Sequence, residues 1–101
     1  MDLTTTENDR EHEVSIRVGP RFDFNIHGPF RNAYRYRQPS GTRYVIDLFG
    51  TEYMDSSALG MLLLLRQHAG GDRASIRIVN VQPAVREILE IANFQRLFDI
   101  R

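Results

Sequence analysis

The sequence contains no lysine, no cysteine and no tryptophan, and each absence removes a kind of chemistry. Without lysine there is no Schiff-base nucleophile and no phosphate-loop lysine. Without cysteine there is no thiolate nucleophile, no disulfide and no cysteine-ligated zinc. The chain also lacks a glycine-rich phosphate loop. These absences make an enzyme the least expected class for this protein.

The sequence also has no net charge and no apolar segment long enough to cross a membrane. The 13 basic residues, all of them arginine, balance 13 acidic ones. A neutral chain does not show the electrostatic footprint of a nucleic-acid-binding protein. The longest apolar run, residues 59–65 interrupted by Gly60, is too short to span a bilayer, and the polar segment 1–13 is not a signal peptide. We therefore expect a cytoplasmic protein with no direct nucleic-acid partner and no membrane insertion.

The length and composition fit a single globular domain. The chain has 101 residues, of which 42% are hydrophobic and 26% charged. Residues 1–12 are polar and include three consecutive threonines, which predicts a flexible N-terminal leader. The folded domain is accordingly expected over residues 13–101.

Apolar periodicity predicts the elements of the first half of the chain. Residues 14–18 and 22–26 alternate between apolar and polar, and the turn at 19–20 is Gly-Pro, so an antiparallel hairpin is expected. A helix is expected over about residues 29–37, because proline is well tolerated at a first helical position. Residues 44–49 form an apolar run typical of a central strand.

The second half alternates helix and strand. A nearly all-apolar helix is expected over residues 58–70, buried or covered by a partner, followed by a strand at 75–81. An amphipathic helix begins near Pro83, and residues 97–100 form either a last short strand or an apolar tail. The order β-β-α-β-α-β-α predicts an α/β fold with a mixed β-sheet of four to five strands packed with helices.

The segment Asp55-Ser56-Ser57 is the most informative in the sequence. It lies where a buried strand has ended and a helix begins, close to free backbone N–H groups and the positive end of a helix dipole. The simplest interpretation is a helix cap, because Asp and Ser are preferred at that position.

Two functional interpretations stay open beside the cap. A serine nucleophile needs a base, and of the three histidines only His27 could reach Ser57; the segment also lacks the Gly-x-Ser-x-Gly elbow. Alternatively, Ser57 is itself phosphorylated, since a helix N-terminus favours phosphate. The modification would add about −1.5 to −2 charges beside Asp55, which would change what the surface binds without unfolding the helix.

Four stretches in register resemble the STAS-domain anti-sigma factor antagonists. The sharpest is Asp-Ser-Ser-Ala-Leu-Gly, followed by a run of apolar residues. The likeness extends over about residues 13–100, so it includes nearly the whole chain. The four matching stretches are residues 19–23 at the second strand, 44–48 at the central strand, 55–65 at the Ser pair and its helix, and 78–89 with Phe98 downstream.

The resemblance implies a STAS fold and a partner-switching function. It places the phosphorylation site at Ser57, with Asp23, Asp55 and Ser56 as supporting, partner-binding residues. The unphosphorylated protein is expected to bind an anti-sigma factor, often a serine kinase, and so to free the sigma factor for transcription. Phosphorylation would break the complex, and a PP2C-type phosphatase would restore it. Neither a cofactor nor a metal is expected.

The sequence departs from the family pattern at three places. Ala58 stands where glycine is usual, and both residues suit a helix start. The segment from Gly19 to Asp23 is one residue longer than the commonest spacing. Asn93 replaces a glycine after the last helix, and asparagine tolerates the same left-handed conformation.

Two other functions are weighed against the switch. One is a small non-catalytic STAS subunit of a lipid-transport or other multiprotein complex, to which the apolar residues 62–65 would be suited. The other is an enzyme, such as a nucleotide hydrolase, which the missing residue types place last.

Three further features are expected to have structural roles. Phe30, Ala33 and Tyr34 are expected to face the core, and the neighbouring arginines to form a solvated helix face, which could also contact an acidic partner. His27 has no second ligand at metal spacing, so it is not expected to bind a metal. Gly60 costs about 1 kcal/mol relative to alanine inside a helix, so close packing of the helix on the sheet is expected to require it.

Overall fold

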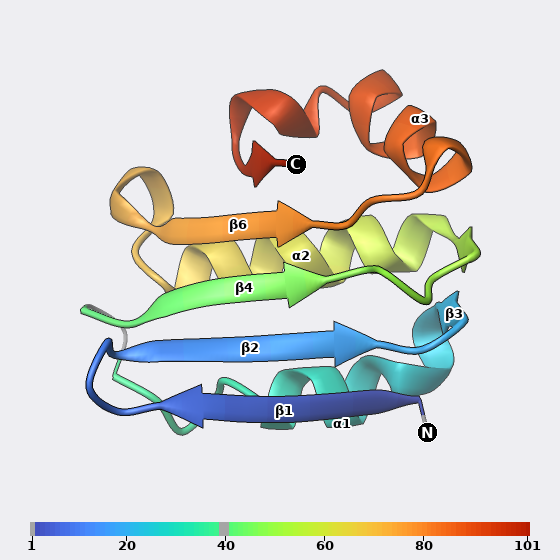
Figure 1. The fold of residues 1–101 in the computed structure, drawn as a ribbon. Helices are drawn as coiled ribbons and strands as arrows, with labels where there is room; N and C mark the ends of the chain where they lie inside the picture. Colours follow the sequence, from blue (N-terminus) through green and yellow to red (C-terminus); the bar gives the residue numbers. More distant parts are fainter. Residues whose placement is uncertain (1, 39–40) are drawn as a thin grey trace.

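The computed structural model describes residues 2–38 and 41–101 and contains one mixed β-sheet (Figure 1). The sheet has five strands in the order β1-β2-β4-β6-β7. The edge strand β1 runs antiparallel to β2, whereas β2, β4, β6 and β7 pair in parallel. The predicted α/β fold with a mixed sheet is therefore confirmed. The strands are β1 (Leu3–Asn8), β2 (Glu13–Val18), β4 (Arg43–Asp47), β6 (Ser75–Val79) and β7 (Asp99–Ile100).

Helices connect the parallel strands, and a small second sheet lies at the end of the large one. The second sheet contains only the parallel pair β3 (Arg21–Phe22) and β5 (Tyr53–Met54). Helices α1 and α2 lie behind the main sheet in Figure 1 and pack against each other. The helical segments are η1 (Phe24–Ile26), α1 (His27–Asn32), α2 (Ser56–His68), η2 (Gly71–Arg73), α3 (Pro83–Ile91) and η3 (Phe94–Arg96). None of the helices found in the described parts of the chain is long and apolar enough to cross a membrane.

The core lies between the sheet and helices α1 and α2. Strand residues alternate between the two faces of the sheet, so every second residue points toward the helices. Ile16, Ile46 and Ile78 of the three central strands are fully buried there, together with Leu62 and Leu65 of α2. Burying one large aliphatic side chain stabilises the fold by about 1.5–3 kcal/mol, so this layer supplies much of the driving force for folding.

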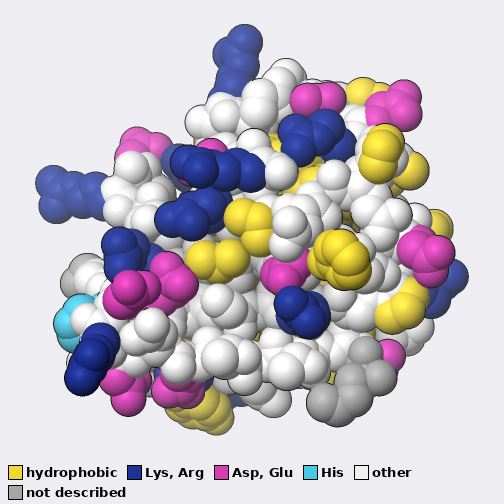
Figure 2. Space-filling view, in the orientation of Figure 1, with side chains coloured by type: hydrophobic (Ala, Val, Ile, Leu, Met, Phe, Trp, Pro, Cys, Tyr) yellow, Lys and Arg dark blue, Asp and Glu magenta, His cyan; other side chains and the backbone are white. Residues whose placement is uncertain are grey.

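The opposite face of the sheet is not covered by a helix and is polar. Ser15, Arg17 and Arg77 point to this side, and Arg17 forms a 3.1 Å ion pair with Asp47 on the next strand. Figure 2 shows basic and acidic side chains next to one another over the face that Figure 1 presents. This face therefore carries charges of both signs.

Residues 3–8 differ from the sequence prediction of a flexible leader over residues 1–12. Leu3–Asn8 form strand β1, which pairs with β2 along its whole length, from Leu3 opposite Val18 to Asn8 opposite Glu13. Threonine favours strands, but an edge strand exposed on both faces shows no apolar alternation. Only Leu3 of this strand packs against the core, so the pattern of apolar residues did not indicate a strand.

The predicted hairpin between residues 14–18 and 22–26 is wrong. Strand β2 pairs with β1 and β4, and after Pro20 the chain leaves the main sheet. The Asp23 side chain accepts a hydrogen bond from the Asn25 backbone N–H at 3.0 Å and begins the 3₁₀ turn η1. Asp side chains bonded to nearby backbone compete with strand pairing in this way. Only Phe22 of the expected second strand remains extended and buried.

The later elements agree better with the sequence. Helix α1 is shorter than predicted and begins earlier, at His27, because η1 has already turned the chain. Helix α2, strand β6 and helix α3 form where they were expected, and Asn93 adopts the left-handed conformation with φ 61°. The final residues form a short strand, β7, and not a tail. However, α2 is not buried all round, because Leu64 is 53% exposed.

Candidate functional site

Asp55 caps helix α2 and also binds the hydroxyl of Ser57. Its backbone is extended, with φ −105° and ψ 178°, and its Oδ1 accepts a hydrogen bond from the Ala58 N–H at 3.1 Å. The same Oδ1 accepts a second hydrogen bond from the Ser57 Oγ at 2.6 Å. The predicted cap is thus confirmed, and the cap residue directly contacts the predicted phosphorylation site.

The pKa of the Asp55 carboxyl is held below its ordinary value. The hydrogen bond from the Ser57 hydroxyl is the largest cause, and the backbone N–H groups of Ala58, Ser57 and Phe24 add to it. Hydrogen bonds to the charged form favour that form. At neutral pH, Asp55 is therefore an anion that orients the Ser57 hydroxyl through a charge-assisted hydrogen bond.

The small sheet brings Asp23 next to Asp55. Phe22 of β3 pairs with Met54 of β5, so the aspartates that follow the two strands emerge side by side. The Asp55 N–H donates to the Phe22 carbonyl oxygen at 3.3 Å. Two sequence motifs about thirty residues apart thus meet through the parallel pairing of β3 and β5.

Asp23 is a buried anchor at this site. It is only 6% exposed, and its Oδ2 accepts a hydrogen bond from the Arg21 Nε at 3.2 Å. The Arg21 guanidinium also lies over the exposed Tyr53 ring, 4.3 Å from its centre. The arrangement indicates that Asp23 fixes the turn before η1, whereas Arg21 and Tyr53 form the exposed surface there.

The nucleophile–base arrangement needed for serine catalysis does not form. His27 stacks on Phe24, with ring centres 4.9 Å apart, and His68 lies at the other end of α2. The Ser57 hydroxyl donates its hydrogen bond to Asp55, a carboxylate, and no histidine bonds to it in the described residues. In residues 2–38 and 41–101 there is likewise no group of three or more His, Asp or Glu side chains that could hold a metal ion.

An apolar groove beside Ser57 was not predicted from the sequence. We call it the Ser57 groove; its volume is about 490 Å³. Phe24 is 65% exposed at one side, and Leu63 and Leu64 are exposed at the other. Large apolar side chains gathered on a surface are typical of interaction sites. The groove is lined by Phe24, His27, Ser57, Gly60, Met61, Leu63, Leu64 and Gln67.

Gly60 does not have the role that was expected for it. It lies on the exposed side of α2, and a Cβ added to it would meet nothing within 4 Å. Close packing of α2 on the sheet therefore does not require glycine here, and the earlier explanation is wrong. The missing side chain instead leaves the wall of the Ser57 groove open.

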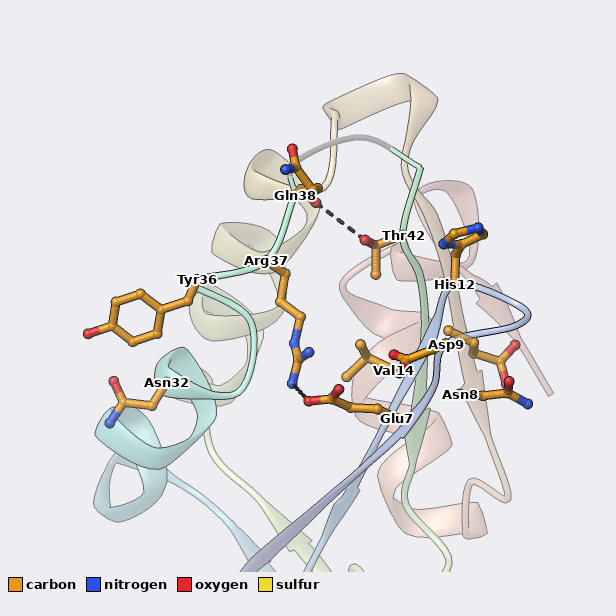
Figure 3. Close-up of a pocket in the computed structure, with 11 residues that line it drawn as sticks. Glu7, Asn8, Asp9, His12, Val14, Asn32, Tyr36, Arg37, Gln38 and Thr42 are labelled. Carbon is orange, nitrogen blue, oxygen red and sulfur yellow. Dashed lines mark hydrogen bonds and ion pairs between the residues drawn. The ribbon is translucent and has the colours of Figure 1, made fainter.

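A second pocket lies at the other end of the sheet and contains none of the predicted site residues. It is a polar depression of about 400 Å³ between the β1–β2 turn and the segment after α1 (Figure 3). Glu7 and Arg37 meet across it as an ion pair, and the Thr42 hydroxyl donates to the Gln38 carbonyl oxygen. The ion pair links β1 to the chain that follows α1.

A family model and a full-length relative match this chain. The family model described as "Mlab, STAS domain" matches residues 5–99. A STAS-domain containing protein of Pseudomonas aeruginosa (strain UCBPP-PA14) is 49% identical over 100 residues, which are 99% of this chain and 99% of that protein.

Solved structures show the same fold at low sequence identity. An anti-sigma-factor antagonist (STAS) domain protein from Planctomyces limnophilus has a TM-score of 0.81 and 20% identity, over 99% of this chain and 89% of that one. The anti-sigma factor antagonist SpoIIAA matches in its unphosphorylated form with a TM-score of 0.74 and 17% identity, over 98% of this chain and 87% of that one. Bacillus SpoIIAA in its phosphorylated form matches with a TM-score of 0.67 and 16% identity, over 98% and 90%. Since the family model covers nearly the whole chain and a full-length relative is 49% identical, this protein belongs to the STAS domain family.

Proposed function

We propose that this STAS domain is an anti-sigma factor antagonist whose binding to its partner is switched by phosphorylation of Ser57. One observation carries the proposal: the hydroxyl of Ser57 lies in the first turn of α2, at the edge of an exposed apolar groove. A modification at this atom changes the charge of an interaction surface without disturbing the core.

The contact between Ser57 and Asp55 explains how a phosphate would act. The unmodified hydroxyl donates its proton to the Asp55 carboxylate at 2.6 Å. A phosphorylated Ser57 has no such proton to donate and carries about −1.5 to −2 charges next to an anion. Repulsion then turns the phosphate away from Asp55. The Ala58 N–H still binds Asp55, so the helix keeps its cap.

The remaining predicted residues support this switch in different ways. Asp23 shapes the turn that presents Phe24, and Ser56 is exposed beside Ser57. In this proposal the partner is an anti-sigma factor that is itself a serine kinase, and a PP2C-type phosphatase reverses the modification. The protein acts in the cytoplasm, where sigma factors work, and catalyses no reaction of its own.

Phosphorylation is tested with a serine kinase of the anti-sigma type. The kinase and ATP are incubated with the wild type, Ser57→Ala and Ser56→Ala, and mass spectrometry counts and locates the phosphate. We expect one phosphate on the wild type and on Ser56→Ala, and none on Ser57→Ala. A wild type that takes no phosphate, or takes it on Ser56, would remove the basis of the switch.

Partner release is tested with a charge mimic. We expect Ser57→Glu to weaken binding to the anti-sigma factor about tenfold or more, whereas Ser75→Glu adds the same charge at the start of β6 and leaves binding unchanged. Isothermal titration calorimetry measures both affinities. Equal affinities of Ser57→Glu and the wild type would contradict the proposed release.

A second candidate is a permanent, non-catalytic STAS subunit of a lipid-transport complex. The Ser57 groove favours it, because an apolar surface also suits a stable contact. Co-purification distinguishes the two functions: an ATPase and a permease would indicate the transport complex, and an anti-sigma factor would indicate the switch.

A further inference from the structure

The Ser57 groove is the first half of a longer groove between α1 and α2. A second depression begins where it ends, and the two share His27, Leu64 and Gln67. We call the combined feature the α1–α2 groove. Along α2 it extends from Ser57 to His68, which is about 16 Å at 1.5 Å per residue. That length matches about three turns of a second helix. The second half is lined by His27, Arg31, Tyr34, Arg35, Tyr36, Leu64, Gln67 and His68.

The two halves of the groove differ in chemistry. The half next to Ser57 is apolar, whereas the other half carries Arg31 and Arg35. Both arginines are exposed, and neither forms an ion pair with any residue that the structure describes, in contrast to Arg37, which pairs with Glu7. No acidic side chain lines either half. The groove is therefore apolar at one end and positive at the other.

Gly60 is the residue that suggests a helix as the occupant. Glycine inside a helix is less stable than alanine, and no atom of the described residues lies within 4 Å of a Cβ added to Gly60. Its place on the groove wall leaves room for the backbone of a second helix. Amphipathic helices bind in apolar grooves through side chains spaced three and four residues apart.

We propose that the α1–α2 groove binds an acidic amphipathic helix of the partner protein. The apolar side of that helix packs on Phe24, Leu63 and Leu64, with its closest approach at Gly60, and its acidic residues lie over Arg31 and Arg35. The inference rests on the proposed function, because it names the chemistry of the partner at the switched site. A phosphate on Ser57 then adds negative charge to a groove that selects a negative ligand.

A pair of synthetic peptides tests the charge preference. Both are helices of about fourteen residues with leucine along one side of the first two turns; on the same side of the last two turns, one carries glutamate and its counterpart carries lysine at the same positions. They are titrated into the ¹⁵N-labelled full-length protein, and NMR shift changes give the affinity and the location. We expect the acidic peptide to bind about tenfold tighter or more, with the shifts confined to α1, α2 and Phe24.

Matched pairs of arginine variants test whether the preference for the acidic peptide arises in the α1–α2 groove. Arg31→Glu combined with Arg35→Glu is expected to weaken binding of the acidic peptide about tenfold or more. Arg77→Glu combined with Arg96→Glu makes the same charge change on the far face of the sheet and in η3, and is expected to leave the affinity unchanged. Gly60→Gln is expected to weaken binding more than Gly60→Ala, because the glutamine side chain occupies more of the groove than the alanine methyl group does.

Several results would overturn the inference. They are equal affinities of the two peptides, no binding of either, shifts located outside the groove, or equal effects of the two arginine pairs. Binding of phosphatidylglycerol vesicles through Arg31 and Arg35 without binding of the acidic peptide would instead assign the groove to a lipid surface. The proposed function is tested separately: a wild type that prefers the acidic peptide but takes no phosphate on Ser57 contradicts only the switch, and the reverse result contradicts only the groove.

Discussion

At the scale of single residues, the Asp55 carboxylate links the stability of α2 to the state of Ser57. One oxygen accepts hydrogen bonds from both the Ala58 N–H and the Ser57 hydroxyl. The same oxygen atom therefore caps the helix and accepts the hydrogen bond that a phosphorylated Ser57 could no longer donate.

Removal of the Asp55 side chain tests the cap. We expect Asp55→Ala to lower the free energy of unfolding by about 1 kcal/mol, within the range of about 0.5–2 kcal/mol for lost helix caps. Asp55→Asn keeps an acceptor for the Ala58 N–H and should lose much less. Urea unfolding followed by circular dichroism measures both, and equal losses would show that the cap is not the cause.

The lowered pKa of Asp55 predicts how stability changes with pH. Because the pKa is lower in the folded protein than its ordinary value of 3.8, the folded state holds this proton less tightly than the unfolded state. The resulting stabilisation is present above about pH 3.8 and is lost as the pH falls through the folded value. The stability advantage of the wild type over Asp55→Asn should therefore shrink below pH 4. An advantage that stays constant from pH 7 to pH 3 would contradict this assignment.

A substitution at Gly60 is expected to raise the free energy of unfolding, in contrast to Asp55→Ala. Its surroundings have space for a Cβ, and alanine is favoured over glycine inside a helix by about 1 kcal/mol. We expect Gly60→Ala to raise the free energy of unfolding by roughly that amount in a urea titration. A destabilised variant would show that the helix needs glycine for a contact within the protein.

At the scale of elements, strand β1 is a part of the sheet that the sequence did not indicate. Its backbone pairs with β2 over six residues, and Arg37 binds Glu7 from the chain after α1. The amide hydrogens of β1 that face β2 should therefore exchange with solvent more slowly than those of an unfolded peptide. Hydrogen exchange followed by NMR measures this, with the exposed amides of the β1–β2 turn as the internal control. Exchange at unfolded rates along β1 would support the flexible leader.

The elements that the sequence predicted well have strong local signals. Helix α2 begins directly after Asp55, which caps it, and α3 begins with Pro83 in its first turn. The hairpin and the start of α1 were predicted wrongly because the Asp23 side chain bonds to the backbone two residues ahead and turns the chain early. That competition depends on a single side chain, which an alternating apolar pattern does not reveal.

At the scale of the whole molecule, the parts of the site come together only through tertiary structure. The sequence predicted Ser57 and its neighbours as one segment, and the likeness to the family added Asp23. The α1–α2 groove was not predictable, because it needs two helices from separate parts of the chain to lie side by side. The neutral net charge also concealed its positive end, since acidic residues elsewhere balance Arg31 and Arg35.

The fold should persist when charge is added at Ser57. This residue lies outside the core layer, and Ser57→Glu keeps the Ala58 N–H bonded to Asp55. We expect the circular dichroism spectrum and the radius of gyration from small-angle scattering to match those of the wild type. An expanded particle would mean that the variant loses partner binding by unfolding and not by repulsion.

The parallel pairing of β2, β4 and β6 also determines when the groove exists. Val14 pairs with Tyr44, and Tyr44 with Ile76, so each pairing closes a loop of about thirty residues. Pairings so distant in sequence slow folding, because chain entropy is lost before the contacts form. Helices α1 and α2 lie within these two loops, so their shared groove takes shape only as the sheet is completed. A newly made chain therefore cannot engage its partner through the groove until this slow step is over.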